Sequence, residues 1–418
     1  MHPREGWIDR GTRRAPDPDD ASLTRRQLLA AGAGLMLTGA VAGCSSVNPA
    51  AAISKPPLPR PTSPVKWPVY ADNKPIASGL APERGATLQI YNWVAYINES
   101  VIKNFCRKYN CNYQVTTFNT IEEALAKLST GELKFDVFFP TVPVLGQLVA
   151  AKLIRPLNHS YIPNIANVWP DYLDPFYDRR WQYTTPYSIY TTGIAWRKDK
   201  VNLAPSWNMP WQAAADRGKV AILDDYREGL SLALLHAGNL NLNETSSSRI
   251  QAAGRALKQL SALTGVRIDN NDFTDVPTGK TWIHQAWSGD MSLANEYLPQ
   301  GTSVDTIGYW FPANRKGPVA NDLMVNLSAG ANPVLAHKFI DYMLDVSNAL
   351  ENYSYVGYMQ PLSEVTPEKL TSEKLLVPQL ASTVVLPDYF RHGLFELELP
   401  PAADAVWEST WNTFSKGL

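Results

Sequence analysis

Lys219-Val-Ala-Ile-Leu-Asp-Asp-Tyr-Arg-Glu228 is the stretch that best indicates both the fold and a candidate site. Its apolar run, 220–223, ends in two aspartates, and a helical pattern continues from Gly229. This order predicts a buried strand that leads into the N-terminus of a helix. In α/β sheets, ligands bind outside the carboxyl ends of the strands, so we expect a site at this junction.

Two interpretations of Asp225 and Glu228 remain open. The two acids are three residues apart, so their carboxylates would lie on one face of the first helical turn and could meet a ligand together. The same spacing is that of a capping box, in which Asp225 is the N-cap and Glu228 the third helical residue. Spacing alone is compatible with both interpretations.

The first 44 residues have the features of an export signal. Arg25 and Arg26 lie just before an apolar, small-residue stretch, 28–43, which is too short for a membrane-spanning helix. The stretch ends in Val-Ala-Gly-Cys44, which resembles a bacterial lipobox, whose cysteine becomes the lipidated first residue of the mature protein. We therefore expect residues 1–44 to be a twin-arginine lipoprotein signal peptide, exported in the folded state, with Cys44 as the lipid attachment site.

Residues 45–85 are rich in proline and predict an extended stalk without a core between the lipid and the body. The remaining chain is long enough for two domains. No later segment has the roughly 18 consecutive apolar residues of a membrane span. A formal net charge of −1 argues against nucleic acid as a partner.

Two cysteines remain after the signal peptide. Cys106 lies in a helical pattern, 99–109, and Cys111 directly precedes a strand pattern, 112–118. Outside the cytoplasm, cysteines so placed are expected to pair and to close the helix-to-strand corner. Their spacing is not that of a zinc site, and we expect no metal and no cofactor.

The body of the chain alternates predicted strands and helices. Strands are predicted at 88–93, 113–118, 135–139, 220–223, 282–287 and 322–327, and helices at 99–109, 121–128, 144–152, 230–237, 247–264, 333–346 and near the C-terminus. The βαβαβ order of the first part predicts a parallel, doubly wound sheet. A long extended stretch, 186–196, is predicted to cross into a second lobe, where the alternation begins again.

Five short segments support a family resemblance when they are taken in order. They are Leu-Gln-Ile-Tyr-Asn-Trp-Val-Ala-Tyr at 88–96, Leu-Asp-Asp-Tyr-Arg-Glu at 223–228, Ala-Trp-Ser-Gly at 286–289, Asp322 at a strand start, and Val-Gly-Tyr-Met-Gln-Pro at 356–361. Together they resemble the periplasmic spermidine/putrescine-binding proteins, which are the receptors of polyamine ABC importers. The resemblance extends over about 88–364.

This resemblance implies a two-lobed α/β fold, the type II periplasmic-binding-protein fold, with a ligand cleft between the lobes. Lobe 1 would comprise 86–190 and 318–350, and lobe 2 would comprise 191–317 and 351–418. The lobes would close on the ligand like a trap.

The resemblance also implies a set of ligand-binding residues: Trp93, Tyr96, Thr141, Asp225, Glu228, Trp287 and Asp322. Asp225 and Glu228 would bind an ammonium end of the ligand and Asp322 an inner amine, since carboxylates accept charge-assisted hydrogen bonds from ammonium groups. The aromatic residues would cover the methylene chain and add cation–π attraction.

Two positions depart from the family pattern. Pro143 stands where the family has an aromatic residue after the third strand, although Thr141 keeps a hydroxyl in that loop. Ala320 stands where the family has a tryptophan two residues before the inner aspartate. These departures leave amine binding plausible and the identity of the amine open. Other aromatic residues could refill the space.

We expect a lipid-anchored, monomeric binding protein on the outer face of the cytoplasmic membrane that delivers a polyamine to an ABC permease and its ATPase. The alternative ligands are another organic amine or a sugar, and a less favoured alternative is an exported cell-envelope enzyme. We do not expect an enzyme, because the sequence shows no catalytic constellation. The His residues form no metal pattern, no Gly-x-Ser-x-Gly occurs, and Thr278–Thr281 lacks the first glycine of a phosphate-binding loop. Four further polar residues are expected on the surface: Glu351, Gln360, Glu396 and Glu398.

Overall fold

The computed structural model describes residues 57–131 and 133–417, so the predicted signal peptide, Cys44 and the start of the predicted stalk lie outside the described residues. The strands are β1 (Thr87–Trp93), β2 (Asn112–Phe118), β3 (Val137–Phe138), β4 (Thr184–Arg197), β5 (Val220–Ile222), β6 (Arg267–Ile268), β7 (Ile283–Trp287), β8 (Ile307–Trp310) and β9 (Val319–Asn326). The longer helices are α2 (Glu99–Tyr109), α3 (Ile121–Ser129), α4 (Leu145–Ala150), α6 (Tyr226–His236), α7 (Ser247–Thr264), α10 (Pro333–Met343), α11 (Val346–Val356), α12 (Pro367–Ser372), α13 (Pro387–His392) and α14 (Pro401–Ser415).

The first three strands form the predicted parallel unit, in the order β2–β1–β3. Helix α2 has the bounds that the sequence predicts. It begins after Asn98, whose side chain accepts a hydrogen bond from the Ser100 backbone, and it ends at Asn110 in a left-handed conformation with φ 50°. Buried apolar side chains, including Phe105, fasten the helix to the sheet.

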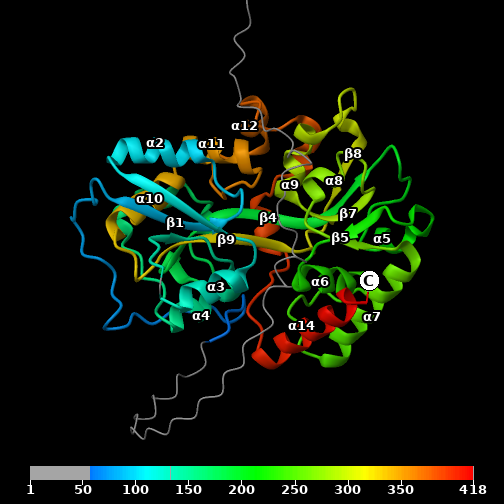
Figure 1. The fold of residues 1–418 in the computed structure, drawn as a ribbon, viewed down its shortest axis with the longest axis horizontal. Helices are drawn as coiled ribbons and strands as arrows, with labels where there is room; N and C mark the ends of the chain where they lie inside the picture. Colours follow the sequence, from blue (N-terminus) through cyan, green and yellow to red (C-terminus); the bar gives the residue numbers. More distant parts are fainter. Residues whose placement is uncertain (1–56, 132, 418) are drawn as a thin grey trace, which may run out of the picture. The chain divides into compact units, whose positions relative to one another are not determined.

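Strand β4 links the two halves of the sheet (Figure 1). Its first part, Thr184–Thr191, pairs with β9. Its second part pairs with β7 on one side, from Thr192, and with β8 on the other, from Ile194. The extended stretch that the sequence predicts as a crossover is therefore one continuous strand shared by both halves.

The prediction of a parallel sheet is wrong for the molecule as a whole. β9 runs antiparallel to both β3 and β4, and β7 and β8 run antiparallel to β4. Among the strands of the described residues, parallel pairing occurs in the outer units, β2–β1–β3 and β6–β5–β7. Alternation along the chain predicts the order of elements, but it does not predict the direction in which a strand runs when it returns after a long excursion.

Three helices, α6, α7 and α14, cover the second half of the sheet and form a small core of their own with β5 (Figure 1). Helix α6 lies close to α14 at Gly229, where an added Cβ would stand 2.3 Å from the Trp411 ring. Trp407 and Trp411 belong to this core, whereas the segment before α14 contributes Leu370 and Leu380 to the larger core around β1 and β9.

The described part of the predicted stalk packs against the body instead of standing free. Val65, Trp67 and Ile76 are buried in the larger core. The Trp67 Nε1 donates to the Tyr177 carbonyl at 2.8 Å. The expectation that this segment lacks a core is therefore wrong from Val65 onward, because a proline-rich composition excludes helix and sheet but not the burial of single apolar side chains.

Among residues 57–131 and 133–417, no helix has both the length and the apolar run that a membrane span requires.

Replacing Trp67 by alanine should lower the free energy of unfolding by about 3–5 kcal/mol, because it removes a fully packed indole and its hydrogen bond. Urea denaturation followed by circular dichroism measures the effect. Val69→Ala is the matched control, since Val69 is 51% exposed and should change stability by no more than about 0.5 kcal/mol. Equal effects of the two substitutions would contradict the packing of this segment.

Candidate functional site

The inner acidic residue, Asp322, lies on β9 directly opposite Ser188 of β4. Its Oδ2 accepts hydrogen bonds from the Tyr96 hydroxyl at 2.8 Å and from the Ser188 hydroxyl at 3.2 Å. Its Oδ1 is buried and has no donor among the described residues. Burial raises the pKa of Asp322 to about 6, although both hydrogen bonds act in the opposite direction.

Residues expected around the inner acid divide into two groups. Tyr96 contacts Asp322 directly, and Thr141 forms a backbone bridge with it. Trp93 is half-buried; its indole donates to the Phe139 carbonyl at 3.0 Å, and its ring lies 4.5 Å from that of Phe118. These contacts of Trp93 hold β1 against its neighbours. They include neither Asp322, which we call the first acidic group, nor Asp225 and Glu228, which we call the second.

Asp225 and Glu228 have different roles at the start of α6. Asp225 is the N-cap, and its Oδ1 accepts from the backbone N–H groups of Arg227 at 2.8 Å and Glu228 at 3.1 Å. Glu228 does not close a capping box. Its Oε1 accepts instead from the Thr192 hydroxyl at 2.8 Å and from the Trp287 indole at 2.9 Å. The capping interpretation therefore holds for Asp225, while the Glu228 carboxylate joins α6 to β4 and β7.

The second acidic group contains a residue that the sequence argument missed. Glu396, expected on a solvated face, is half-buried and accepts from Ser231 of α6 at 2.9 Å. Burial raises its pKa to about 7, and the Arg227 guanidinium partly offsets that rise. No local signal could have found Glu396, because only the return of the chain after α13 brings it to α6.

Glu228 has the most perturbed environment of this group. It is 7% exposed, and its Oε2 has no donor among the described residues. Burial raises its pKa well above the usual range, and the nearby carboxylates of Glu396 and Asp225 raise it further. Desolvation also raises the pKa of Asp225, and the two backbone hydrogen bonds that its carboxylate accepts oppose the rise.

Tyrosine rings lie between the two acidic groups. The Tyr358 ring makes edge contacts with Tyr96, at 5.0 Å between centroids, and with Tyr190 of β4, at 5.3 Å. Gln360, expected on the surface, is 2% exposed, and neither polar atom of its amide has a partner among the described residues. Glu351 is half-exposed and accepts from Asn104, as a surface role would require.

A further pair of acids, the buried Asp272 and the half-buried Asp290, lies next to Trp287 and Tyr358. Asp272 accepts from the Trp287 backbone N–H at 3.1 Å. Burial raises the pKa of Asp290 to about 6, although hydrogen bonds from Asp272 and Tyr358 oppose the rise. Asp272 therefore fixes the backbone of Trp287, and Asp290 contacts Tyr358.

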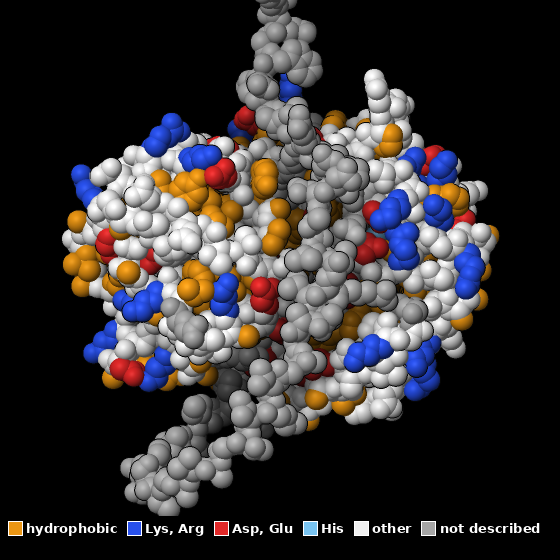
Figure 2. All heavy atoms as spheres, in the orientation of Figure 1, with side chains coloured by type: hydrophobic (Ala, Val, Ile, Leu, Met, Phe, Trp, Pro, Cys, Tyr) orange, Lys and Arg blue, Asp and Glu red, His pale blue; other side chains and the backbone are white. Residues whose placement is uncertain are grey.

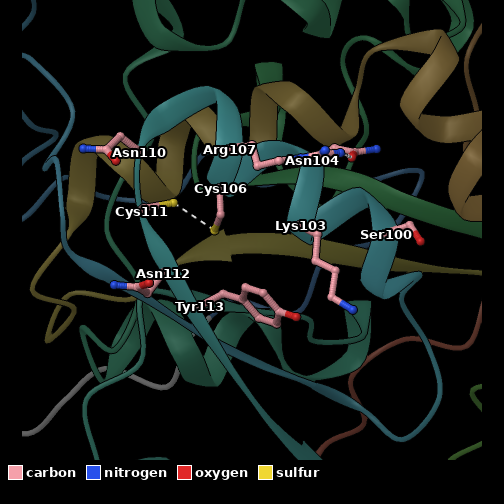
Figure 3. Close-up of a pocket in the computed structure, with 9 residues that line it drawn as sticks. All are labelled: Ser100, Lys103, Asn104, Cys106, Arg107, Asn110, Cys111, Asn112 and Tyr113. Carbon is pink, nitrogen blue, oxygen red and sulfur yellow. Dashed lines mark hydrogen bonds between the residues drawn. The ribbon is translucent and has the colours of Figure 1, made fainter.

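The predicted cysteine pair lies away from the acidic groups, in a surface hollow of about 820 Å³ over α2 and β2 (Figure 3). The sulfur atoms of Cys106 and Cys111 are 2.9 Å apart, and both residues are thiols in this structure. Lys103, Arg107 and Tyr113 also line the hollow. The disulfide stays a prediction for the exported protein.

The visible charge of the surface is mixed. Figure 2 shows Lys and Arg side chains spread over both sides of one face, with several Asp and Glu side chains toward its middle. The formal net charge of the chain is only −1. A cation would therefore be selected by the local carboxylates and not by a long-range field.

The comparisons with known proteins agree with this arrangement. The sequence model of the bacterial extracellular solute-binding protein family matches residues 100–378. The putrescine/cadaverine-binding protein of Pseudomonas aeruginosa is 28% identical over 288 residues, which are 67% of this chain and 80% of that protein. The spermidine/putrescine-binding periplasmic protein of Escherichia coli is 25% identical over 337 residues, which are 79% of this chain and 92% of that protein.

Among solved structures, the TpPotD lipoprotein of Treponema pallidum superposes with a TM-score of 0.68 at 21% identity, and the match covers 78% of this chain and 99% of that one. The chain belongs to the bacterial extracellular solute-binding protein family. Its two-lobed type II fold is the one that the resemblance implied.

The raised carboxyl pKa values predict that stability depends on pH. In the unfolded chain the carboxyl pKa values are near 4, so between about pH 4 and pH 7 the folded protein holds protons that the unfolded chain releases. The free energy of unfolding without ligand should therefore fall as the pH rises from about 4 to about 7. A cation binds the ionised carboxylates, so its affinity should rise over about pH 5–8 and binding should release protons. Calorimetry in buffers of different ionisation enthalpy measures the release. Proton uptake on binding would contradict this view.

Proposed function

We propose that this chain is a substrate-binding protein of an ABC importer that captures a polyamine, such as putrescine, cadaverine or spermidine, and delivers it to a membrane permease. One observation carries the proposal. Glu228 and Asp322 each keep one carboxylate oxygen buried without a donor, at the two ends of a stretch lined by tyrosine. An unpaired buried carboxylate is costly, and a charged hydrogen-bond donor from a ligand would offset that cost.

The chemistry of the site fits a linear amine. Ser188 contacts Asp322 and Thr192 contacts Glu228. These two positions of β4 are four residues apart, which is on the order of 13 Å along the strand at ~3.3 Å per residue. Ammonium groups at either end would meet the free oxygens, while tyrosine rings cover the methylenes and add cation–π attraction of about 0.5–2 kcal/mol each. Asp225 and Glu396 would add negative charge at one end.

The two-lobed arrangement supports capture by closure. We assign lobe 1 to 86–190 and 318–350, with Asp322, and lobe 2 to 191–317, with Glu228. The last segment, 351–418, was expected in lobe 2, but only its end packs in the smaller core, while Leu370 and Leu380 pack in the larger one. A ligand that bridges both acids would favour the closed form, and the permease and its ATPase would recognise that form. The role requires no reaction at the site.

The alternative ligand classes are a different organic amine and a neutral sugar. A sugar needs hydroxyl and amide partners more than carboxylates, and Gln360 could supply an amide. The unpaired carboxylate oxygens favour the amine. An exported cell-envelope enzyme is less favoured, since burial and neighbouring carboxylates account for the raised pKa values without a catalytic role.

A thermal-shift and calorimetry screen tests the ligand. Putrescine, cadaverine and spermidine should each raise the melting temperature, because a ligand at 100 times its dissociation constant stabilises the fold by about 2.7 kcal/mol. Asp322→Asn should weaken binding by about 10- to 150-fold, the loss of a charged hydrogen bond worth about 1.5–3 kcal/mol. It should not destabilise the unliganded protein, because burial disfavours the carboxylate.

Asp216→Asn is the matched control, since Asp216 ends a short 3₁₀ helix before β5 and takes no part in either acidic group. It should leave amine affinity unchanged. A shift with sugars only, or full amine affinity in Asp322→Asn, would overturn the amine proposal and leave the fold assignment intact.

We also propose export by the twin-arginine signal and anchoring through Cys44, although both features lie outside the described residues. The lipobox-like sequence at 41–44 supports this, and so does the lipoprotein nature of the Treponema pallidum relative. Cys44→Ser should move the protein from the membrane fraction to the soluble extracytoplasmic fraction, as cell fractionation and immunoblotting would show. Arg84→Ser, outside the signal, should leave the distribution unchanged. Unaltered membrane association of Cys44→Ser would contradict the anchor.

A further inference from the structure

We propose that Tyr190 determines which amines the site accepts: its ring forms the wall between the two acidic groups, and its hydroxyl accepts a hydrogen bond from a secondary ammonium at the centre of the ligand. The inference rests on the proposed function and names a specificity-determining residue that lies outside the predicted ligand set.

The position of Tyr190 follows from the pleat of β4. Side chains two residues apart lie on one face of a strand, so Ser188, Tyr190 and Thr192 share a face. Ser188 contacts Asp322, and Thr192 contacts Glu228. Tyr190 is therefore the residue of this face that stands midway between the two acidic groups.

The electrostatic surroundings agree with that position. The pKa of Tyr190 is raised well above its usual value, first by burial and then by the carboxylates of Asp322, Glu228, Glu396 and Asp225. Acids from both groups therefore act on the same hydroxyl. The phenol stays neutral at physiological pH, so its oxygen keeps lone pairs that can accept from an ammonium N–H.

The cross-strand neighbour of Tyr190 explains how its ring fits. The register of β4 and β9 places Tyr190 directly opposite Ala320, and such pairs have Cβ atoms about 4.5–5.5 Å apart on the same face. Ala320 leaves room for the phenol ring, and Tyr358 contacts it edge-on at 5.3 Å. Midway between the two acidic groups, the aromatic ring therefore comes from Tyr190 on β4, and Ala320 on β9 supplies none.

This geometry separates ligands by the chemistry of their centre. A diamine such as putrescine or cadaverine has only methylenes between its ends and would contact the ring alone. A triamine such as spermidine has a secondary ammonium along its chain and would gain the hydroxyl as well. The hydroxyl of Tyr190 therefore favours triamines, and its ring favours both classes.

Calorimetric titration of three variants with putrescine, cadaverine and spermidine tests the inference. Tyr190→Phe, which keeps the ring, should weaken spermidine binding about tenfold and change diamine binding less than about twofold. Tyr190→Ala should weaken binding of all three amines. Adding Ala320→Trp to Tyr190→Ala should restore part of the diamine affinity, because it rebuilds a wall from the opposite strand.

Tyr113→Phe is the matched control, because it removes a tyrosine hydroxyl on β2, in the separate hollow over α2. It should leave all affinities unchanged. Equal weakening of diamines and spermidine by Tyr190→Phe, or no change with either, would overturn the inference while the binding function stands. Failure of the unsubstituted protein to bind any amine would instead overturn the proposed function.

Discussion

The position of the site depends on a single strand that belongs to both halves of the sheet. β4 pairs with β9 through its first part and with β7 and β8 through its second part. Ser188 and Thr192, on one face of this strand, each donate a hydrogen bond to an acid from a different element. The regular rise of an extended strand therefore sets the spacing of the two acidic groups, however far apart their residues lie in the sequence.

The second constraint is the cost of burying carboxylates without a counter-ion. The fold partly offsets this cost by giving one oxygen of Asp322 and one oxygen of Glu228 two hydrogen-bond donors each. The other oxygen of each carboxylate has no donor among the described residues. Desolvation raises the pKa of both groups, so the unliganded site holds protons that a cation would displace. A binding protein can use such a site because the ligand supplies the charge that the fold omits.

The aromatic residues near the two acidic groups are tyrosines that contact one another. Pro143 and Ala320 leave two places without a ring, yet Tyr96, Tyr358 and Tyr190 form a continuous series of edge contacts. Tyrosine also brings hydroxyl groups to the site, which tryptophan does not. Their burial between carboxylates keeps these hydroxyls neutral and available as hydrogen-bond donors and acceptors.

The sequence by itself determined the family and several of the elements, although it did not predict β6, β8 or α11. The periodicity of apolar residues predicted α2 and α7 to the residue, and local capping chemistry placed the start of α6 at Asp225. These features depend on neighbours within one or two turns, so a single sequence contains them. Only the tertiary structure decided the antiparallel direction of β9, the packing of Trp67 and the approach of Glu396 and Tyr190 to the acids. Each of these features depends on where the chain returns after a long excursion, and no local sequence pattern encodes that return.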